Sequence, residues 1–140
     1  MSAKDKPKRD VRIFLSYASE DKNRAAELTS QLAQRPNLHV FSADKMSAGE
    51  NWQSKIKKEL SASDFFVILL SPTSMQSKWV QFELGAAWGL NKFIIPVVTS
   101  HDLLNKIPVD LAGLHVIEME HLKKADVISE IMDLYEKAAA

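Results

Sequence analysis

Hydrophobic residues along this chain gather in short, nearly apolar runs separated by longer stretches of mixed polarity. The runs lie at residues 11–16, 38–42, 65–70, 93–98 and 115–119. Their β-branched and aromatic residues predict strands, and the wholly apolar run FFVILL at 65–70 predicts a central strand buried on both faces. Pro96 cannot donate to a sheet ladder, so we expect an edge strand or a bulge at 93–98.

Between these runs, apolar residues recur every three to four positions, which predicts helices. One helix follows residues 11–16, begins near Ser19 or Asp21 and buries Ala25, Leu28 and Leu32. Others are expected at 52–60, at 77–90 and at about 126–137. Strand and helix therefore alternate about five times, which predicts an α/β, doubly wound parallel sheet. A single domain is expected over 11–140, after a polar lead or linker at 1–10 that we expect to be disordered.

The helix predicted at 77–90 (SKWVQFELGAAWGL) differs from the others. Ser77 is a good N-cap, and helical spacing from it predicts a buried stripe made of Trp79, Phe82, Glu83, Ala86, Ala87 and Leu90. Glu83 is the one charged member, and a buried unpaired carboxylate is costly. Either a cation neutralises it structurally, or the stripe opens there into a pocket. Gly85 and Gly89 form a G-x-x-x-G pattern that predicts close packing of this helix.

In doubly wound sheets, ligands bind at the carboxyl ends of the strands. Here those ends are Ser16-Tyr17-Ala18, Ala43-Asp44 and Ser71-Pro72. Glu83 lies roughly 9 Å along its helix from that edge, so it can reach the crevice. The polar loop 44–51 is long enough to cover it.

Composition excludes several classes of function. The net charge is zero, which argues against binding nucleic acid or an anionic membrane through a basic field. Without cysteine there is no disulfide, thiol nucleophile or Cys-ligated zinc, and the four histidines show no metal-ligand spacing. No phosphate-binding glycine loop and no G-x-S-x-G nucleophile elbow occurs. The N-terminus lacks the apolar segment of a signal peptide, so a cytoplasmic location is expected.

Taken together, the motifs resemble the TIR (Toll/interleukin-1 receptor) domain family, of the bacterial type. The resemblance rests on Ile13-Phe14-Leu15-Ser16-Tyr17 followed by acidic residues, on Asp44 with its loop to Gly49 and Trp52, on Leu69-Leu70-Ser71-Pro72, on Ser77-Lys78-Trp79-Val80 with Glu83-Leu84, and on Ile95-Pro96-Val97. It runs from about Val11 to Val98 and continues more weakly beyond. It implies a flavodoxin-like sheet with strand order 2-1-3-4-5.

By this resemblance the chain is an enzyme that cleaves NAD+, with NAD+ as substrate and no cofactor or metal. Enzymatic members carry a glutamate four residues after a tryptophan, here Glu83 after Trp79, and Glu83 is then the catalytic residue. One carboxylate suffices for this chemistry. The nicotinamide ring of NAD+ is already a cationic pyridinium and departs as a neutral amine, so no acid is needed to protonate the leaving group. Its task is to stabilise the charge that develops on the ribose.

The resemblance also implies further site residues and partners. Tyr17, Ala18, Ser19, Ser47, Trp52 and Trp79 are expected near the substrate. Some enzymatic members have an arginine where this chain has Ala18-Ser19, which leaves Lys45 or Lys78 for the phosphates. Asp44, Lys45, Met46 and Gly49 belong to the loop through which TIR domains self-associate into homo-oligomers. A sensor or effector domain outside these residues, and a role in bacterial anti-phage immunity, are implied as well.

Alternatives remain open from the sequence. The domain could be a non-catalytic interaction module, an adaptor or host-signalling effector, in which Glu83 is a structural charge. If it is an enzyme, its product is ADP-ribose or a cyclic ADP-ribose. Trp52 fits a core anchor of its helix somewhat better than a ligand contact.

Overall fold

The structure is a computed structural model that describes residues 10–42, 51–107, 116–123 and 132–133. Its centre is a parallel sheet of five strands in the order β2-β1-β3-β4-β5, the flavodoxin-like order that the resemblance implied. The strands are β1 (Val11–Ser16), β2 (Leu38–Phe41), β3 (Phe65–Leu70), β4 (Phe93–Val98) and β5 (Ile117–Glu118). The bounds of β1, β3 and β4 are those predicted, whereas β2 ends one residue early.

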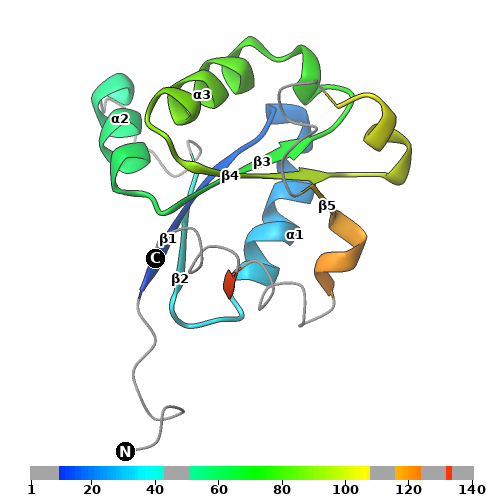
Figure 1. Ribbon diagram of the computed structural model, residues 1–140, viewed down its shortest axis with the longest axis horizontal. Coiled ribbons are helices and arrows are strands. Elements are labelled where there is room, and N and C mark those ends of the chain that lie inside the picture. Colours follow the sequence, from blue (N-terminus) through cyan, green and yellow to red (C-terminus); the bar gives the residue numbers. More distant parts are fainter. Residues whose placement is uncertain (1–9, 43–50, 108–115, 124–131, 134–140) are drawn as a thin grey trace, which may run out of the picture.

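Helices cover both faces of the sheet (Figure 1). On one face lies α1 (Lys22–Leu32), which buries Ala25, Leu28 and Leu32 as predicted. On the other lie α2 (Trp52–Ala62) and α3 (Lys78–Gly89). Short 3-10 turns occupy Ser19–Asp21, Ser74–Gln76, His101–Asn105 and Met119–Lys123. Of the helix expected at 126–137, only residues 132–133 are described, and they are helical.

Successive side chains of the strands point alternately into two separate hydrophobic cores, one on each face of the sheet. Residues Val11, Ile13 and Leu15 of β1 pack toward α1, whereas Phe14 and Ala18 pack with Ile56 of α2 and Val80 of α3. All six residues of β3 are buried, as predicted for a strand covered on both faces. The order in which strands are added to the sheet reverses between β1 and β3, and in this fold the crevice at that switch point is the usual place for a ligand.

The prediction of an edge or bulge at Pro96 was wrong. β4 lies between β3 and β5, and Pro96 is in register with Ile68 of β3. Proline is nevertheless accommodated, because β5 pairs only with Val97 and Val98 among the described residues. Pro96 therefore has a registered neighbour on one side. The strand expected at 115–119 is shorter than predicted, and Met119 already belongs to a 3-10 turn.

The predicted buried stripe of α3 was partly wrong. The buried residues are Val80, Glu83 and Ala87, while Phe82 and Leu90 are 56% and 47% exposed. Apolar residues lie on all sides of this helix, so their spacing did not define a single inward face. Close packing at the two glycines was wrong as well, because a Cβ added at Gly85 or Gly89 would meet nothing within 4 Å.

A lysine joins the ends of α2 and α3. Lys92 follows α3, and its ammonium donates hydrogen bonds of 2.8 Å to the backbone carbonyls of Ser61 and Ser63. These carbonyls belong to the last turn of α2 and the residue after it, where a helix leaves acceptors without intrahelical partners. The cation thus holds the two neighbouring helices together at their C-terminal ends.

Candidate active site

Glu83 lies on the buried face of α3 and is only 1% exposed. The helix is fixed at its start by Ser77, whose hydroxyl accepts a hydrogen bond from the Val80 amide at 3.3 Å. One turn separates Val80 from Glu83, so the cap and the buried side chain of Val80 together set which residue points at the sheet. The glutamate singled out in the sequence is therefore directed inward.

The Glu83 carboxyl has one hydrogen-bond partner among the described residues. Its Oε1 accepts from the Ser16 hydroxyl at 2.7 Å, and both residues are buried. Its Oε2 is buried as well and has no hydrogen-bond partner within the described residues. No described cation forms an ion pair with Glu83. Within this part of the chain, the structural explanation of Glu83 by a neutralising cation thus finds no support.

Burial changes the acidity of this carboxyl. Removal from water raises the pKa of Glu83 from its ordinary 4.5 to about 7, and the hydrogen bond from Ser16 offsets part of that rise. Desolvation disfavours the charged form of the carboxyl, whereas a hydrogen-bond donor favours it. Desolvation is the larger of the two effects on Glu83. The carboxyl is therefore close to half ionised near neutral pH.

A cleft of about 370 Å³ lies among the segment after β1, the segment after β3 and the start of α3. It is lined by Ala18, Ser19, Glu20, Thr73, Gln76, Ser77 and Trp79. Ala18 comes two residues after Ser16, and Trp79 comes one helical turn before Glu83. Glu83 itself does not line the cleft; it lies on α3, the helix that also carries Trp79.

Hydrogen bonds join the two sides of the cleft. The Ser71 hydroxyl, just after β3, donates to the Asp21 carboxylate, in the turn that follows β1. Ser71 and Ser74 also bind each other: the Ser71 amide donates to the Ser74 hydroxyl at 2.7 Å, and the Ser74 amide donates to the Ser71 hydroxyl at 3.0 Å. The loops at the carboxyl ends of β1 and β3 are thereby fixed relative to each other.

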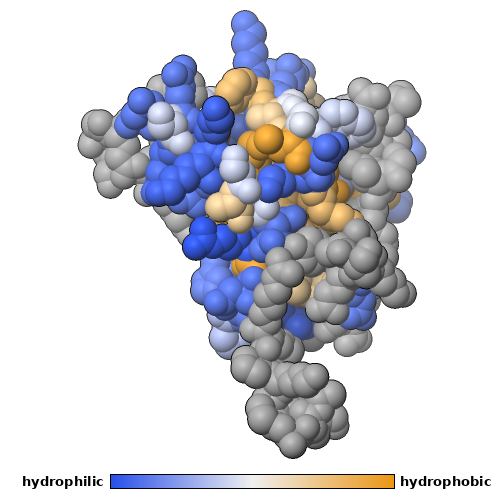
Figure 2. Space-filling model, turned by 60° about the vertical axis from the view of Figure 1, so that its left-hand side comes forward, coloured by the Kyte–Doolittle hydropathy of each residue, from blue (hydrophilic) through white to orange (hydrophobic). Residues whose placement is uncertain are grey.

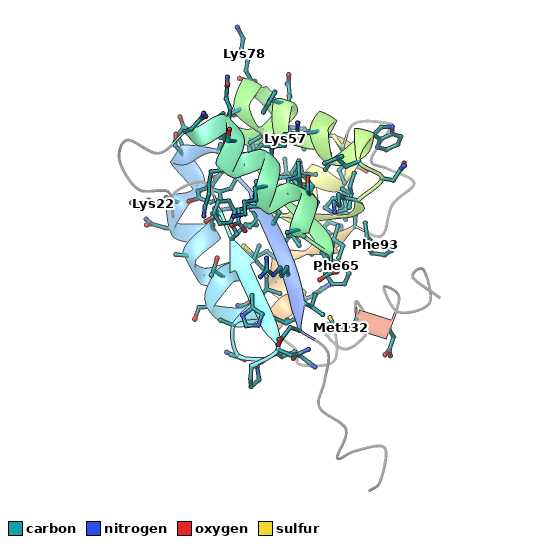
Figure 3. All side chains as sticks on the ribbon, turned by 90° about the vertical axis from the view of Figure 1, so that its left-hand side faces the viewer. Lys22, Lys57, Phe65, Lys78, Phe93 and Met132 are labelled. Atoms are coloured by element: carbon teal, nitrogen blue, oxygen red, sulfur yellow. The ribbon has the colours of Figure 1, made fainter. Side chains whose placement is uncertain are left out.

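The structure brings together three of the residues predicted near the substrate, since Ala18, Ser19 and Trp79 all line the cleft. Tyr17 does not join them; it is half-buried and packs against the core on the α1 side. Lys78 is exposed, and its side chain points away from the body of the protein in Figure 3. Ser47 and the loop residues Asp44, Lys45, Met46 and Gly49 lie outside the described residues, as does the side chain of Trp52, the first residue of α2.

Sequence reasoning did not assign a role to Ser16, Asp21 or Ser71 in this site. For Ser16 a signal was present, because alternation along β1 places Phe14, Ser16 and Ala18 on one face. Phe14 and Ala18 belong to the core under α2 and α3. The polar residue between them therefore had to face the same helix that carries Glu83.

The described residues do not form a metal site. No group of three or more side chains of the metal-ligating types is placed to hold an ion in that part of the chain. Among the helices described, none has both the length and the apolar composition needed to cross a membrane.

Two curated relatives are similar over most of the chain. A probable 2′ cyclic ADP-D-ribose synthase, TcpO of Methanobrevibacter olleyae, is 24% identical over 135 residues, which are 90% of this chain and 39% of that protein. The NAD(+) hydrolase tir-1 of Caenorhabditis elegans is 31% identical over 98 residues, 64% of this chain and 10% of that protein. The chain thus spans well under half the length of either relative.

Solved structures agree with the fold. The TIR domain of the Toll-related receptor TRR-2 from Hydra magnipapillata superposes with a TM-score of 0.66 at 17% identity, covering 91% of this chain and 98% of that one. At this identity the likeness concerns the fold alone. The family model described as "TIR domain" matches residues 13–132. The chain therefore belongs to the TIR domain family.

Proposed function

We propose that this TIR domain cleaves NAD+ between nicotinamide and ribose, with Glu83 as the catalytic residue. The observation that carries the proposal is the buried Glu83 carboxyl, which has one oxygen held by Ser16 and no described cation beside it. A fold seldom keeps such a group for stability, because an uncompensated buried charge is costly. The relatives named as an NAD(+) hydrolase and a cyclic ADP-D-ribose synthase support the same chemistry.

The proposed reaction breaks one N-glycosidic bond. The bonding electron pair moves to the pyridinium nitrogen, so nicotinamide leaves neutral and the ribose carbon becomes oxocarbenium-like. Ionised Glu83 stabilises that positive charge in a site of low dielectric. Water then attacks the ribose carbon and loses a proton, which gives ADP-ribose, or a nucleophile within the same molecule attacks and gives a cyclic product. A metal or cofactor takes no part in this proposal.

The cleft would hold the substrate beside Glu83. In this proposal Ala18, Ser19 and Trp79, which line it, contact NAD+, together with Tyr17, Ser47 and Trp52. The loop residues Asp44, Lys45, Met46 and Gly49 mediate self-association, which activates the enzyme. We place the protein in the cytoplasm, in anti-phage immunity, beside a sensor or effector domain outside these residues.

Nicotinamide release tests the proposal directly. Concentrated protein is incubated with NAD+, and nicotinamide, ADP-ribose and cyclic products are separated by chromatography. We expect release by the wild type and a loss of about a hundredfold or more in Glu83→Gln, because one preorganised electrostatic group contributes that much. Glu59→Gln is the matched control, since Glu59 lies on α2 and pairs with Lys55; it should retain full activity.

Two outcomes would contradict the proposal. Equal release by Glu83→Gln and the wild type would remove Glu83 from the catalytic role. Silence of the wild type, even when a fused oligomerisation domain forces self-association, would refute NAD+ cleavage by this chain.

A non-catalytic interaction module is the second candidate, and one observation favours it. Phe82 and Trp88 of α3 and its C-cap residue Leu90 are exposed, and Phe82 and Leu90 line a groove of about 500 Å³ with almost wholly apolar walls between α2 and α3. Figure 2 shows hydrophobic residues gathered among hydrophilic ones on the side of the molecule that carries α2. Large exposed apolar patches mark contact surfaces. A wild type silent toward NAD+ in the assay above would select this reading.

A further inference from the structure

We propose that Ser16 is a positioning residue for Glu83: its hydroxyl fixes Oε1 and so leaves Oε2 as the oxygen that faces the substrate. The inference rests on the proposed function, since it assigns a role within the same reaction. It concerns a residue that touches the carboxyl but does not line the cleft.

Ser16 is held rigidly enough to act in this way. It is the last residue of β1, is 1% exposed and stands in register with Ile68 of β3. Strand alternation directs its side chain to the face covered by α3. Donor and acceptor thus come from a strand and a helix that pack directly on each other, and the 2.7 Å bond joins them. A site built on such elements keeps its geometry better than one built on loops.

One fixed oxygen orients the whole carboxyl group. A carboxylate is planar, so a bond to Oε1 sets the rotation of the group and the direction of Oε2. That second oxygen is buried and has no hydrogen-bond partner among the described residues. A buried acceptor is costly to leave without a partner, and a positive charge developing on the ribose would supply one at the moment of reaction.

Few charged side chains lie near Glu83, so the hydrogen bond from Ser16 is the main interaction that favours the ionised form of its carboxyl. Of the elements that contact α3, the strands β3 and β4 and the turn Ser74–Gln76 carry no charged side chain. In β1 the charged residue is Arg12, which is exposed and lies four residues from Ser16.

Other charges nearby are engaged elsewhere or exposed. The turn after β1 carries Glu20, which is exposed, and Asp21, which is half-buried and accepts a hydrogen bond from the Ser71 hydroxyl. Lys78 at the start of α3 is exposed, as are Lys57 and Lys58 of α2, while Lys55 pairs with Glu59. Removing the Ser16 hydroxyl should therefore make Glu83 harder to ionise.

The experiment compares Ser16→Ala with Ser16→Thr, which keeps a hydroxyl, and with Ser63→Ala as the matched control. Ser63 is another buried serine, and its hydroxyl donates to the Leu60 carbonyl at 2.6 Å, away from Glu83. Two quantities are measured for each protein. Glu83 is titrated by difference infrared spectroscopy of the carboxyl band against Glu83→Gln, and kcat and KM for NAD+ are measured from pH 5 to pH 9.

We expect Ser16→Ala to raise the pKa of Glu83 and to move the acid limb of the kcat profile to higher pH by the same amount. Its kcat should fall about tenfold or more on the acid side and recover as the pH rises, because a hydrogen bond to a charged group is lost. KM should change less than twofold, since Ser16 does not line the cleft. Ser16→Thr should restore both quantities, and Ser63→Ala should alter neither.

Different results would contradict the positioning role of Ser16 and the proposed cleavage of NAD+. An unchanged pKa of Glu83 in Ser16→Ala overturns the positioning role, and so does a kcat that falls by one factor at every pH, which indicates damage to the fold alone. If Ser16→Ala does not fold, Ser16→Cys has a weaker donor of similar size and must raise the pKa in the same direction. A wild type without NAD+ cleavage refutes the proposed function and with it the role in turnover, while the titration still decides whether Ser16 governs the ionisation of Glu83.

Discussion

Each face of α3 carries residues of a kind that an ordinary surface helix places on its opposite face. The face toward the sheet buries a carboxyl, Glu83, between Val80 and Ala87. Elsewhere on the helix and at its C-cap, Phe82, Trp88 and Leu90 are exposed, and the two aromatic side chains are 56% and 57% exposed. An amphipathic helix usually places its apolar stripe inward and its charges outward.

The two departures teach different lessons, because only the inward charge costs stability. The inward charge is confined to one residue with a defined donor, as expected of a chemical group held in place. Of the exposed apolar residues, Phe82 and Leu90 line the groove between α2 and α3, as expected of a contact region. A helix can therefore carry chemistry on one face and contact on the other, provided that the rest of the sheet supplies the core.

The largest predicted effect is on the free energy of unfolding and comes from the inward charge of Glu83. Glu83 has a pKa of about 7 in the folded protein and an ordinary value of 4.5, so the folded state keeps a proton that the unfolded chain releases between these values. The free energy of unfolding should thus fall as the pH rises from 4.5 to 7, by at most about 3 kcal/mol. Glu83→Gln should lack this fall and be the more stable protein at pH 8. Urea unfolding at pH 4.5, 6 and 8 tests it; a flat wild-type profile would contradict it.

The second prediction concerns turnover and the same charge. If ionised Glu83 is the active form, kcat/KM for NAD+ should decline below about pH 7, about tenfold per pH unit. In kcat the decline should begin at lower pH, because the bound pyridinium cation favours the carboxylate. Steady-state kinetics from pH 5 to pH 9 gives both curves. A decline centred near the ordinary value of a glutamate would show that Glu83 is not the titrating group.

A smaller effect is expected on the outer face of α3, at Gly85. Glycine in a helix interior is less favourable than alanine, and nothing lies within 4 Å of an added Cβ there. Gly85→Ala should therefore raise the free energy of unfolding by about 1 kcal/mol, measured by urea unfolding. The reverse change at an exposed site of α1, Ala26→Gly, should lower it by a similar amount. Destabilisation by Gly85→Ala would mean that this face is packed against something.

The smallest effect tests the exposed apolar residues. Phe82→Ser and Leu90→Ser should change the free energy of unfolding by no more than about 0.5 kcal/mol each, because both side chains are largely in solvent. The buried neighbour Ile56, on the groove wall, is the contrast: Ile56→Ala should cost about 2 kcal/mol or more. Thermal unfolding of the three variants ranks them. A large loss in Phe82→Ser would show that the outer face is part of the core.

The fold could be predicted from the sequence because the strands are marked twice, by composition and by isolation between turn residues. Phe65–Leu70 and Phe93–Val98 have the bounds expected for them. The inward face of α3 could not be predicted as well. Trp79, Phe82 and Leu90 satisfy helical spacing as fully as Val80 does, so only contact with the sheet decides which residues are buried.

The site was predicted in part for a similar reason. Glu83 is conspicuous because a charge breaks an apolar stripe, whereas Ser16 is a small polar residue at a strand end and breaks no pattern. Its hydrogen bond to Glu83 joins residues 67 positions apart, a separation at which spacing rules say nothing. Only the register of β1 against β3, and the packing of α3 on both, brings them together.

The clamp formed by Lys92 has a consequence for how the protein opens. Its ammonium binds the carbonyls of Ser61 and Ser63 from a position just beyond α3, so the last turn of α2 cannot separate from α3 without breaking charge-assisted bonds. Local opening then involves both helices as one cooperative unit. Amide protons of the C-terminal turns of α2 and α3 should consequently exchange with deuterium at matched rates, although Ala62 and Lys92 are 30 positions apart in the sequence.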